Sequence, residues 1–248
     1  MGASMVSRRT VSSRDRTAHN HKGSSGYSSD TIGNNMDVRT AIRNGDLSAL
    51  QILLLEDASR ANALIRWGAN DRNLTHPLHF VSDMLYEGTL SKGLELPIIN
   101  ALIQSGADLD FQINQKGDTP LIGAAGLLAE DVGLKLLEAG ANAQPRGIFG
   151  ETALHWAAFL GEDRLAAKLI DCSDLNLRDE KYNSPPLGWA IHGFFNPPSG
   201  KRGRQCEVAG VLVAAGARVE PEWLQSEQVQ GDLGMMTALS AQSPSKEQ

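Results

Sequence analysis

Residues 152–161 read Thr-Ala-Leu-His-Trp-Ala-Ala-Phe-Leu-Gly, and this stretch decides the fold. Its apolar side chains run from Leu154 to Leu160 at the spacing of a short helix. Thr152 precedes that run, and a threonine hydroxyl at this position caps a helix by accepting a backbone N–H hydrogen bond. The stretch therefore predicts a short helix that begins just after Thr152.

Similar stretches recur along the chain. The leucines of Thr119-Pro120-Leu121, Thr152-Ala153-Leu154 and Pro185-Pro186-Leu187 follow one another at intervals of 33 residues. Upstream, His76-Pro77-Leu78-His79 repeats the pattern 43 residues before Leu121. A period of this length is typical of repeat proteins, in which each unit buries its apolar stripe against its neighbours.

Each of the three later stretches opens a pair of short apolar runs. The first runs are expected as helices over 121–128, 154–160 and 187–194, and the second over 132–137, 165–170 and 208–213. Gly-Ala follows the second run at Gly106, Gly140 and Gly216. Because glycine accepts the left-handed conformation that ends many helices, these glycines predict where the second helices stop.

The repeated stretch, its period and the helix-ending glycine together resemble the ankyrin-repeat family. Residues 152–161 are similar to the family pattern T-P-L-H-x-A-A-x-x-G, and the resemblance extends from about Asp37 to Glu220. It implies an all-α fold: an ankyrin-repeat α-solenoid of helix-turn-helix units with hairpin-like finger loops. About five repeats are expected, near 37–62, 71–110, 114–146, 147–179 and 180–220.

The expected domain organisation follows from these repeats. Pro221 and Asp232 are suited to begin two further helices that would close the stack. The boundaries are 1–34 for a disordered, basic, serine-rich tail, 35–220 for the ankyrin-repeat domain, 221–241 for C-terminal capping helices and 242–248 for a loose end.

Composition limits the function. A net charge of −6 over 248 residues argues against a dedicated nucleic-acid binder. No window approaches about 18 consecutive apolar residues, so no membrane-spanning helix is predicted. The two cysteines, Cys172 and Cys206, cannot form a disulfide framework. We therefore expect a cytoplasmic protein, while the Arg- and Ser-rich composition of residues 1–29 leaves an organelle transit peptide as an alternative.

Few residues suggest catalysis. His76 and His79 stand three residues apart, and with Asp83 they could begin a hydrolytic or metal site. The resemblance implies a different role, because His79 and His155 fill the family's histidine position, where the imidazole bonds to backbone between repeats. The prediction is a non-enzymatic protein with no catalytic residue, no cofactor and no metal.

The resemblance implies that another protein binds the concave face, which the finger tips and first helices form. Lys116, Phe149 and Tyr182 recur at intervals of 33 residues and are expected to form a ladder along this face. Trp156 and Trp189 are expected to pack in the core. The partner-binding residues predicted are Gln115, Lys116, Asp118, Leu127, Ile148, Phe149, Glu151, Phe159, Leu160, Lys181, Tyr182, Ser184 and His192.

Two loops are longer than the repeat requires, and they leave a second function open. They lie between the two helices of a pair, over 87–95 and 196–205. As a second contact edge, they would suit an accessory or inhibitory subunit that regulates a partner enzyme. In either case we expect a monomer that binds an unidentified protein and neither nucleic acid nor membrane.

Overall fold

A computed structural model describes residues 36–113, 117–198, 200 and 203–241. These residues form thirteen α-helices and one two-stranded sheet, and all but Met36 fall in the compact unit Asp37–Gln248. The predictions for residues 1–34 and 242–248 lie outside the described residues. Among the described helices, none is both long and apolar enough to cross a membrane.

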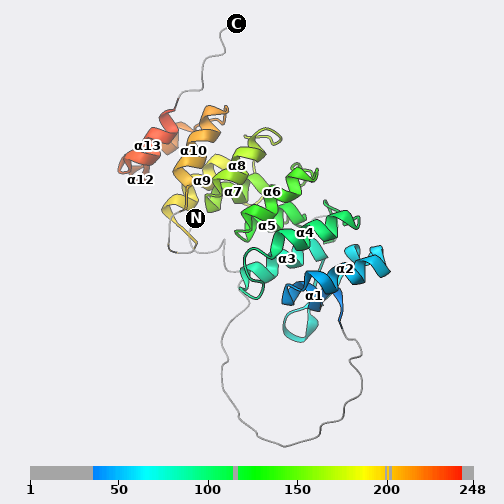
Figure 1. The fold of residues 1–248 in the computed structure, drawn as a ribbon. Coiled ribbons are helices and arrows are strands. Elements are labelled where there is room, and N and C mark those ends of the chain that lie inside the picture. Colours follow the sequence, from blue (N-terminus) through cyan, green and yellow to red (C-terminus); the bar gives the residue numbers. More distant parts are fainter. Residues whose placement is uncertain (1–35, 114–116, 199, 201–202, 242–248) are drawn as a thin grey trace, which may run out of the picture. The chain divides into compact units, whose positions relative to one another are not determined.

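Ten of the helices form five consecutive pairs (Figure 1). The pairs are α1 (Val38–Asn44) with α2 (Leu47–Glu56), α3 (Pro77–Tyr86) with α4 (Glu95–Gln104), α5 (Pro120–Gly126) with α6 (Glu130–Glu138), α7 (Ala153–Leu160) with α8 (Asp163–Ile170), and α9 (Pro186–Phe195) with α10 (Gln205–Ala214). The first helix of each pair packs on the first helix of the next, and the second helices do the same. The predicted helices of the last three pairs are therefore confirmed.

The sequence signals at the helix ends act as expected. Thr119 begins α5, and its Oγ1 accepts the N–H of Ile122 at 3.3 Å. Gly106, Gly140 and Gly216 have φ of 82°, 98° and 102°, in the left-handed region that a side chain would disfavour. Each of these glycines closes a second helix and turns the chain toward the next pair.

A finger precedes the first helix of a pair, and the one before α3 is a short β-hairpin. Strand β1 (Ile65–Trp67) pairs antiparallel with β2 (Asn73–Thr75), with Ile65 opposite Thr75 and Trp67 opposite Asn73. The 3₁₀ turns η1 (Ala58–Asn62) and η2 (Ala69–Asp71) flank and connect the strands. This hairpin fills the segment between η1 and the start of α3.

The core runs between the two helix layers. Leu78, Leu121, Leu154 and Leu187, the leucines of the repeated stretch, are all 0% exposed. Burial of one such side chain contributes about 2 kcal/mol to folding. Because these leucines are fully buried and the first helices of successive pairs pack on one another, the stacking of pairs contributes to the core.

Polar side chains add a second link between successive pairs. The Asn62 amide donates to the Gly106 carbonyl and accepts the Asp108 N–H. Asp110 accepts the N–H of Asn142 at 2.8 Å, and Asn176 accepts that of Arg218 at 2.9 Å. These bonds hold the chain segments that leave successive second helices side by side.

Three helices follow the last pair: α11 (Pro221–Gln225), α12 (Glu227–Gln230) and α13 (Leu233–Ser240). The helix starts predicted at Pro221 and Asp232 are confirmed, and Asp232 Oδ1 accepts the N–H of Met235 at 3.0 Å. Helix α13 packs on α10 and buries Met235 and Leu239. It thereby covers apolar surface of the last pair.

Candidate functional site

Two neighbouring fingers are joined through their backbones. The α7 finger spans residues 147–151, and its turn is closed by the Gly147 N–H, which donates to the Glu151 carbonyl at 2.7 Å. The α9 finger spans residues 179–184. The Glu180 N–H donates to the Phe149 carbonyl at 2.8 Å, so the tip of one finger is fixed against the base of the next.

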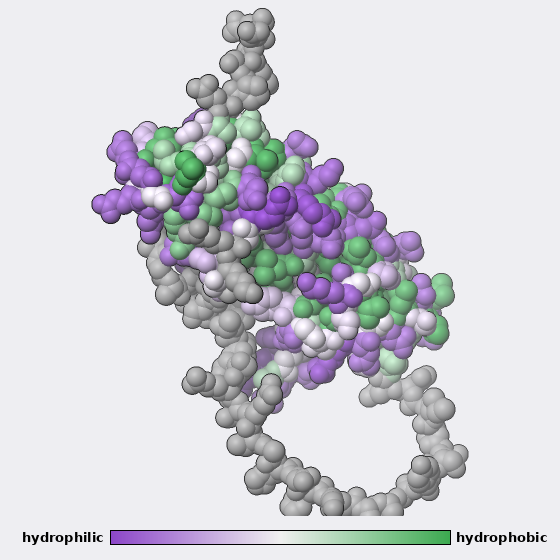
Figure 2. Space-filling model, turned by 60° about the vertical axis from the view of Figure 1, so that its left-hand side comes forward, coloured by the Kyte–Doolittle hydropathy of each residue, from purple (hydrophilic) through white to green (hydrophobic). Residues whose placement is uncertain are grey.

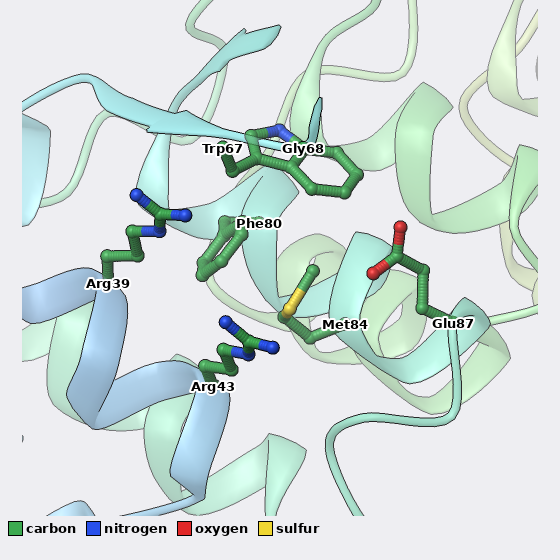
Figure 3. A pocket seen from close by; sticks show the side chains of 7 residues that line it. All are labelled: Arg39, Arg43, Trp67, Gly68, Phe80, Met84 and Glu87. Atoms are coloured by element: carbon green, nitrogen blue, oxygen red, sulfur yellow. The ribbon is translucent and has the colours of Figure 1, made fainter. Parts of the chain in front are cut away.

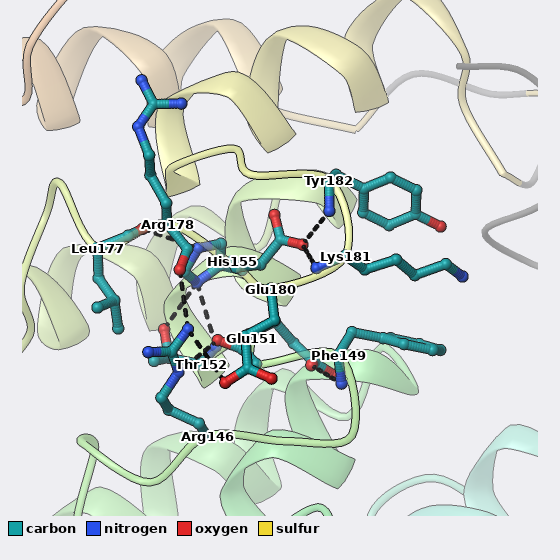
Figure 4. Close-up of polar contacts among 12 residues, drawn as sticks. Arg146, Phe149, Glu151, Thr152, His155, Leu177, Arg178, Glu180, Lys181 and Tyr182 are labelled. Carbon is teal, nitrogen blue, oxygen red and sulfur yellow. Dashed lines mark hydrogen bonds and ion pairs between the residues drawn. The ribbon is translucent and has the colours of Figure 1, made fainter.

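Each finger is organised by one buried carboxylate (Figure 4). Glu151 accepts the Phe149 N–H at 2.8 Å and the indole N–H of Trp156 at 3.0 Å. Burial raises the pKa of Glu151 and outweighs these hydrogen bonds, which lower it. Through these two hydrogen bonds, the Glu151 carboxylate links the finger tip to a core side chain of α7.

Asp179 does the same in the α9 finger with four hydrogen bonds. Its Oδ1 accepts the N–H groups of Lys181 at 2.9 Å and Tyr182 at 2.6 Å. Its Oδ2 accepts the Ser184 N–H at 3.1 Å and the Trp189 indole N–H at 3.0 Å. Because the carboxylate is only 2% exposed, it fixes the finger from inside. The Lys181 side chain is exposed, whereas the half-buried Tyr182 ring packs edge-on against Trp189, with 6.0 Å between ring centres, and its hydroxyl is buried.

The outer side of the two fingers carries an aromatic and cationic cluster made of Phe149, Lys181 and Tyr182. The Lys181 ammonium lies 4.2 Å from the centre of the Phe149 ring and 4.9 Å from that of Tyr182. Both rings are half-buried and Lys181 is exposed. Such cation–π contacts contribute about 0.5–1 kcal/mol at exposed sites, enough to keep the rings and the charge together.

His155 connects α7 to the base of the next finger. Its Nδ1 accepts the Thr152 N–H at 3.1 Å, and its Nε2 donates to the Leu177 carbonyl at 3.1 Å. Burial lowers the pKa of His155 to about 4, so the ring is neutral at physiological pH. His79 contacts the Asp118 carbonyl at 2.8 Å, which confirms that both histidines bond to backbone between pairs.

The predicted partner-binding residues differ in exposure. Ile148 and Lys181 are exposed, whereas Gln115 and Lys116 lie outside the described residues, so the third member of the proposed ladder has no described position. The half-buried ones are Asp118, Leu127, Phe149, Leu160, Tyr182, Ser184 and His192.

Two of the predicted contact residues are wrong, because they face inward. Glu151 is 0% exposed, since the Trp156 indole N–H in the core requires a hydrogen-bond acceptor. Phe159 is 2% exposed and packs edge-on against Trp156 and Trp189, at ring-centre distances of 6.0 Å for each. Neither side chain can contact a partner directly, and Glu151 acts instead by positioning the finger.

Arg146 is a site residue that the sequence reasoning missed. Its Nε donates to the Gly150 carbonyl at 2.8 Å, and its Nη2 donates to the Arg178 carbonyl at 2.9 Å. Its Nη2 also lies 3.9 Å from Glu180 Oε1, so the guanidinium links the α7 finger to the beginning of the α9 finger. A long cationic side chain just before a glycine-rich turn was the available signal, since such a turn leaves carbonyl groups to be satisfied.

The histidines of the alternative hydrolytic site have other hydrogen-bond partners. His76 Nδ1 accepts the Leu78 N–H, and its Nε2 lies 3.0 Å from the Asn62 side-chain oxygen. Burial, followed by the charge of His79, lowers the pKa of His76 to about 4. Among the residues that the structure describes, no group of three or more His, Cys, Asp or Glu could hold a metal ion.

The two long loops pack against turns of the preceding pair. A Cβ added to Gly45, in the α1–α2 turn, would lie 2.5 Å from Leu94 of the first loop. One added to Gly161, in the α7–α8 turn, would lie 2.5 Å from the Arg204 nitrogen of the second. The contribution of these loops to regulating a partner enzyme stays a prediction.

Comparison with protein families matches residues 149–180 to the ankyrin repeat. The matched segment contains both helices α7 and α8, and its first and last residues are the two joined by the backbone hydrogen bond between fingers. Residues 149–180 are thus an ankyrin repeat, as predicted, and the match supports an ankyrin-repeat protein. Proteins of this family are typically non-enzymatic modules that bind other proteins. No curated protein matches the chain.

Asp179→Asn should destabilise the protein by about 2 kcal/mol, because an amide nitrogen would replace one acceptor oxygen and face two N–H donors. Urea unfolding followed by circular dichroism measures the loss. Asp174→Asn is the matched control, since Asp174 is exposed and its carboxylate accepts the N–H of Asn176. Equal stability of the Asp179 variant and the wild type would contradict the bracing role of this carboxylate.

Proposed function

We propose that the chain is a non-enzymatic scaffold whose five helix pairs act as five ankyrin repeats in one solenoid. Its finger and first-helix face, which is concave in this family, would bind a segment of another protein. The observation that carries the proposal is the cluster of Phe149, Lys181 and Tyr182 on two fingers that are braced from inside.

The cluster suits recognition for a physical reason. Aromatic side chains on a rigid support lose little conformational entropy on binding, and they dominate the energetics of many interfaces. Here Glu151 and Asp179 fix the backbone beneath the rings, and Arg146 ties the two fingers together. The rings supply apolar contact area, and the Lys181 ammonium adds a charge that favours a carboxylate in the partner.

The double variant Phe149→Ala/Tyr182→Ala should weaken binding of the partner at least about 100-fold, because it removes both rings of the cluster. The measurement is affinity capture from native lysate, followed by a titration with the captured partner. Circular dichroism establishes that the variant is folded.

A matched control removes two apolar side chains elsewhere. Figure 2 shows that apolar residues reach one face in patches separated by hydrophilic ones. Ile52 and Leu55 on α2 are 57% and 86% exposed, so Ile52→Ala/Leu55→Ala removes two exposed apolar side chains away from the fingers. A partner held equally well by the wild type and both double variants would refute the assignment of the finger face.

A further inference from the structure

A pocket of about 200 Å³ lies between helix α1, the β-hairpin finger and helix α3 (Figure 3). Of its lining residues only Glu87, the first residue of the 87–95 loop, lies in a segment predicted to contact a partner, and the pocket stands apart from the cluster on the α7 and α9 fingers. Its walls come from three separate elements that the fold brings together. It is therefore a second candidate for binding on the side of the chain that carries fingers and first helices.

The walls of the pocket are apolar. Phe80 and Met84 lie one turn apart on α3 and are 1% and 2% exposed. Trp67 of strand β1 meets the Phe80 ring edge-on, with 5.7 Å between ring centres. Gly68 follows Trp67 with φ of 78°, which turns the finger away and leaves the indole as one wall. An aromatic or long aliphatic side chain would find contacts on several sides here.

The rim of the pocket carries an asymmetric set of charges. Arg39 and Arg43 extend from α1 on one side, and Glu87 stands on the other, just after α3. Arg39 forms an ion pair with Asp71 at 2.9 Å, whereas Arg43 has no carboxylate partner among the residues that the structure describes. One guanidinium at the mouth of the pocket is thus available to an anion.

These charges set where the charged group of an occupant would lie. Arg39 and Arg43 both stand on the α1 side of the rim, and the Asp71 carboxylate that pairs with Arg39 compensates one of the two guanidinium charges. Glu87 stands on the other side. A ligand in which an apolar group and a carboxylate lie side by side can therefore fill the pocket with its carboxylate at Arg43.

We propose that this pocket binds the anchor residue of a partner segment: an aromatic or long aliphatic side chain that stands next to a carboxylate. The side chain enters between Trp67, Phe80 and Met84, and the carboxylate faces Arg43, away from Glu87. The proposal rests on the proposed function and adds the chemistry of the bound segment. A carboxylate would also suit Lys181 in the other cluster, so both sites favour an acidic and apolar segment.

The test uses two small probes, N-acetyl-phenylalanine and its neutral amide, and reads the Met84 methyl group by NMR in protein labelled at the methionine methyl groups. The chain has 6 methionines, so Met84→Leu assigns the signal. We expect the acid to shift this signal saturably with a dissociation constant of about 1 mM, a typical efficiency for a ligand of this size. The amide should bind about 5-fold to 10-fold more weakly.

Two charge variants test whether the rim charges cause the preference for the acid over the amide. Arg43→Gln should abolish the preference for the acid, while Glu87→Gln, an equally exposed change of opposite sign, should keep or increase it. High salt should reduce the preference in the wild type, because rim charges are screened. No shift of the Met84 signal at about 20 mM of either probe, or equal binding of acid and amide, would overturn the proposal.

This outcome can be separated from a failure of the proposed function. The probes and the Met84 signal do not involve Phe149 or Tyr182, and the capture experiment does not involve the pocket variants. Equal binding of acid and amide together with capture that depends on the finger cluster would reject the pocket alone. A confirmed acid preference together with capture that ignores the cluster would reject the finger assignment and leave the pocket as a ligand site.

Discussion

Gly193→Ala is expected to destabilise the protein by about 4 kcal/mol or more, one of the largest effects of any single substitution in the chain. Gly193 lies in α9 where this helix crosses α7. A Cβ at this position would lie 2.9 Å from the Phe159 carbonyl carbon and 3.0 Å from its Cδ2, and closer still to its carbonyl oxygen. Because most of the obstacle is backbone, no side-chain rotation relieves it, and the two helices must separate.

Gly210→Ala is the matched control, since Gly210 lies inside α10 and a Cβ there would meet only Ala238, at ordinary distances of 3.9 and 4.0 Å. Alanine is a better helix former than glycine, so this variant should be as stable as the wild type or gain up to about 1 kcal/mol. Urea unfolding midpoints of the two variants provide the comparison. Stabilities of the two variants within about 1 kcal/mol of each other would contradict the close contact of α7 and α9.

The helix pairs could be predicted because their signals are local and repeat. A leucine every 33 residues, a capping residue such as Thr119 and a glycine such as Gly140 each act within one turn of their own position. Agreement of the three then determined where helices begin and end. The family match at residues 149–180 covers the segment in which these signals are most complete.

The direction of individual side chains in the fingers could not be predicted in the same way. Within one finger the residues follow no helical or strand periodicity that would show which side chains face inward. Glu151 was therefore expected to face the solvent beside Phe149, whereas its carboxylate accepts the Trp156 indole N–H in the core. Helical spacing places Phe159 on the first-helix face, but the neighbouring pair supplies Trp189, which covers it.

The pocket at Trp67 was missed for a related reason. The finger before α3 is longer than the others, so its residues do not align with the repeat and no comparison by position was possible. The pocket also depends on α1, whose sequence lacks the repeated stretch. A site formed by the irregular part of a repeat protein becomes visible only once the elements are placed in space.

The contribution of the two buried histidines to stability is expected to change steeply between pH 7 and pH 4. Burial lowers the pKa of both His76 and His155 to about 4, from an ordinary value of 6.5. The unfolded chain therefore binds protons at these two side chains below pH 6.5, while the folded chain does not. Stability from these groups is complete above the unfolded pKa of 6.5 and is lost as the pH falls toward 4.

Buried carboxylates work in the opposite direction and must be separated from the histidines. Burial raises the pKa of Glu162 well above its ordinary value, with the neighbouring Glu130 charge adding to the effect, and it also raises that of Glu151. These two groups favour the folded state at low pH and lose that contribution as the pH rises. The pH dependence of the free energy of unfolding is the sum of these opposing contributions. The contribution of one histidine is therefore obtained by comparing the wild type with a variant that lacks that histidine.

Between pH 7.5 and pH 5, each buried histidine should contribute a loss of about 2 kcal/mol to the free energy of unfolding. His155→Gln should be less stable than the wild type at pH 7.5. The difference in free energy of unfolding between the two proteins should shrink by about 2 kcal/mol at pH 5. The carboxylates do not affect this difference, because both proteins contain them. His192→Gln is the control with a smaller expected change, since His192 is half-buried and its pKa is lowered less. In the folded wild type, the His155 ring signals in NMR should stay those of a neutral imidazole at pH 5. Titration of those signals near pH 6.5, or an unchanged stability difference between wild type and His155→Gln, would show that protonating this ring, which removes the Nδ1 acceptor of the Thr152 N–H, costs the folded protein nothing.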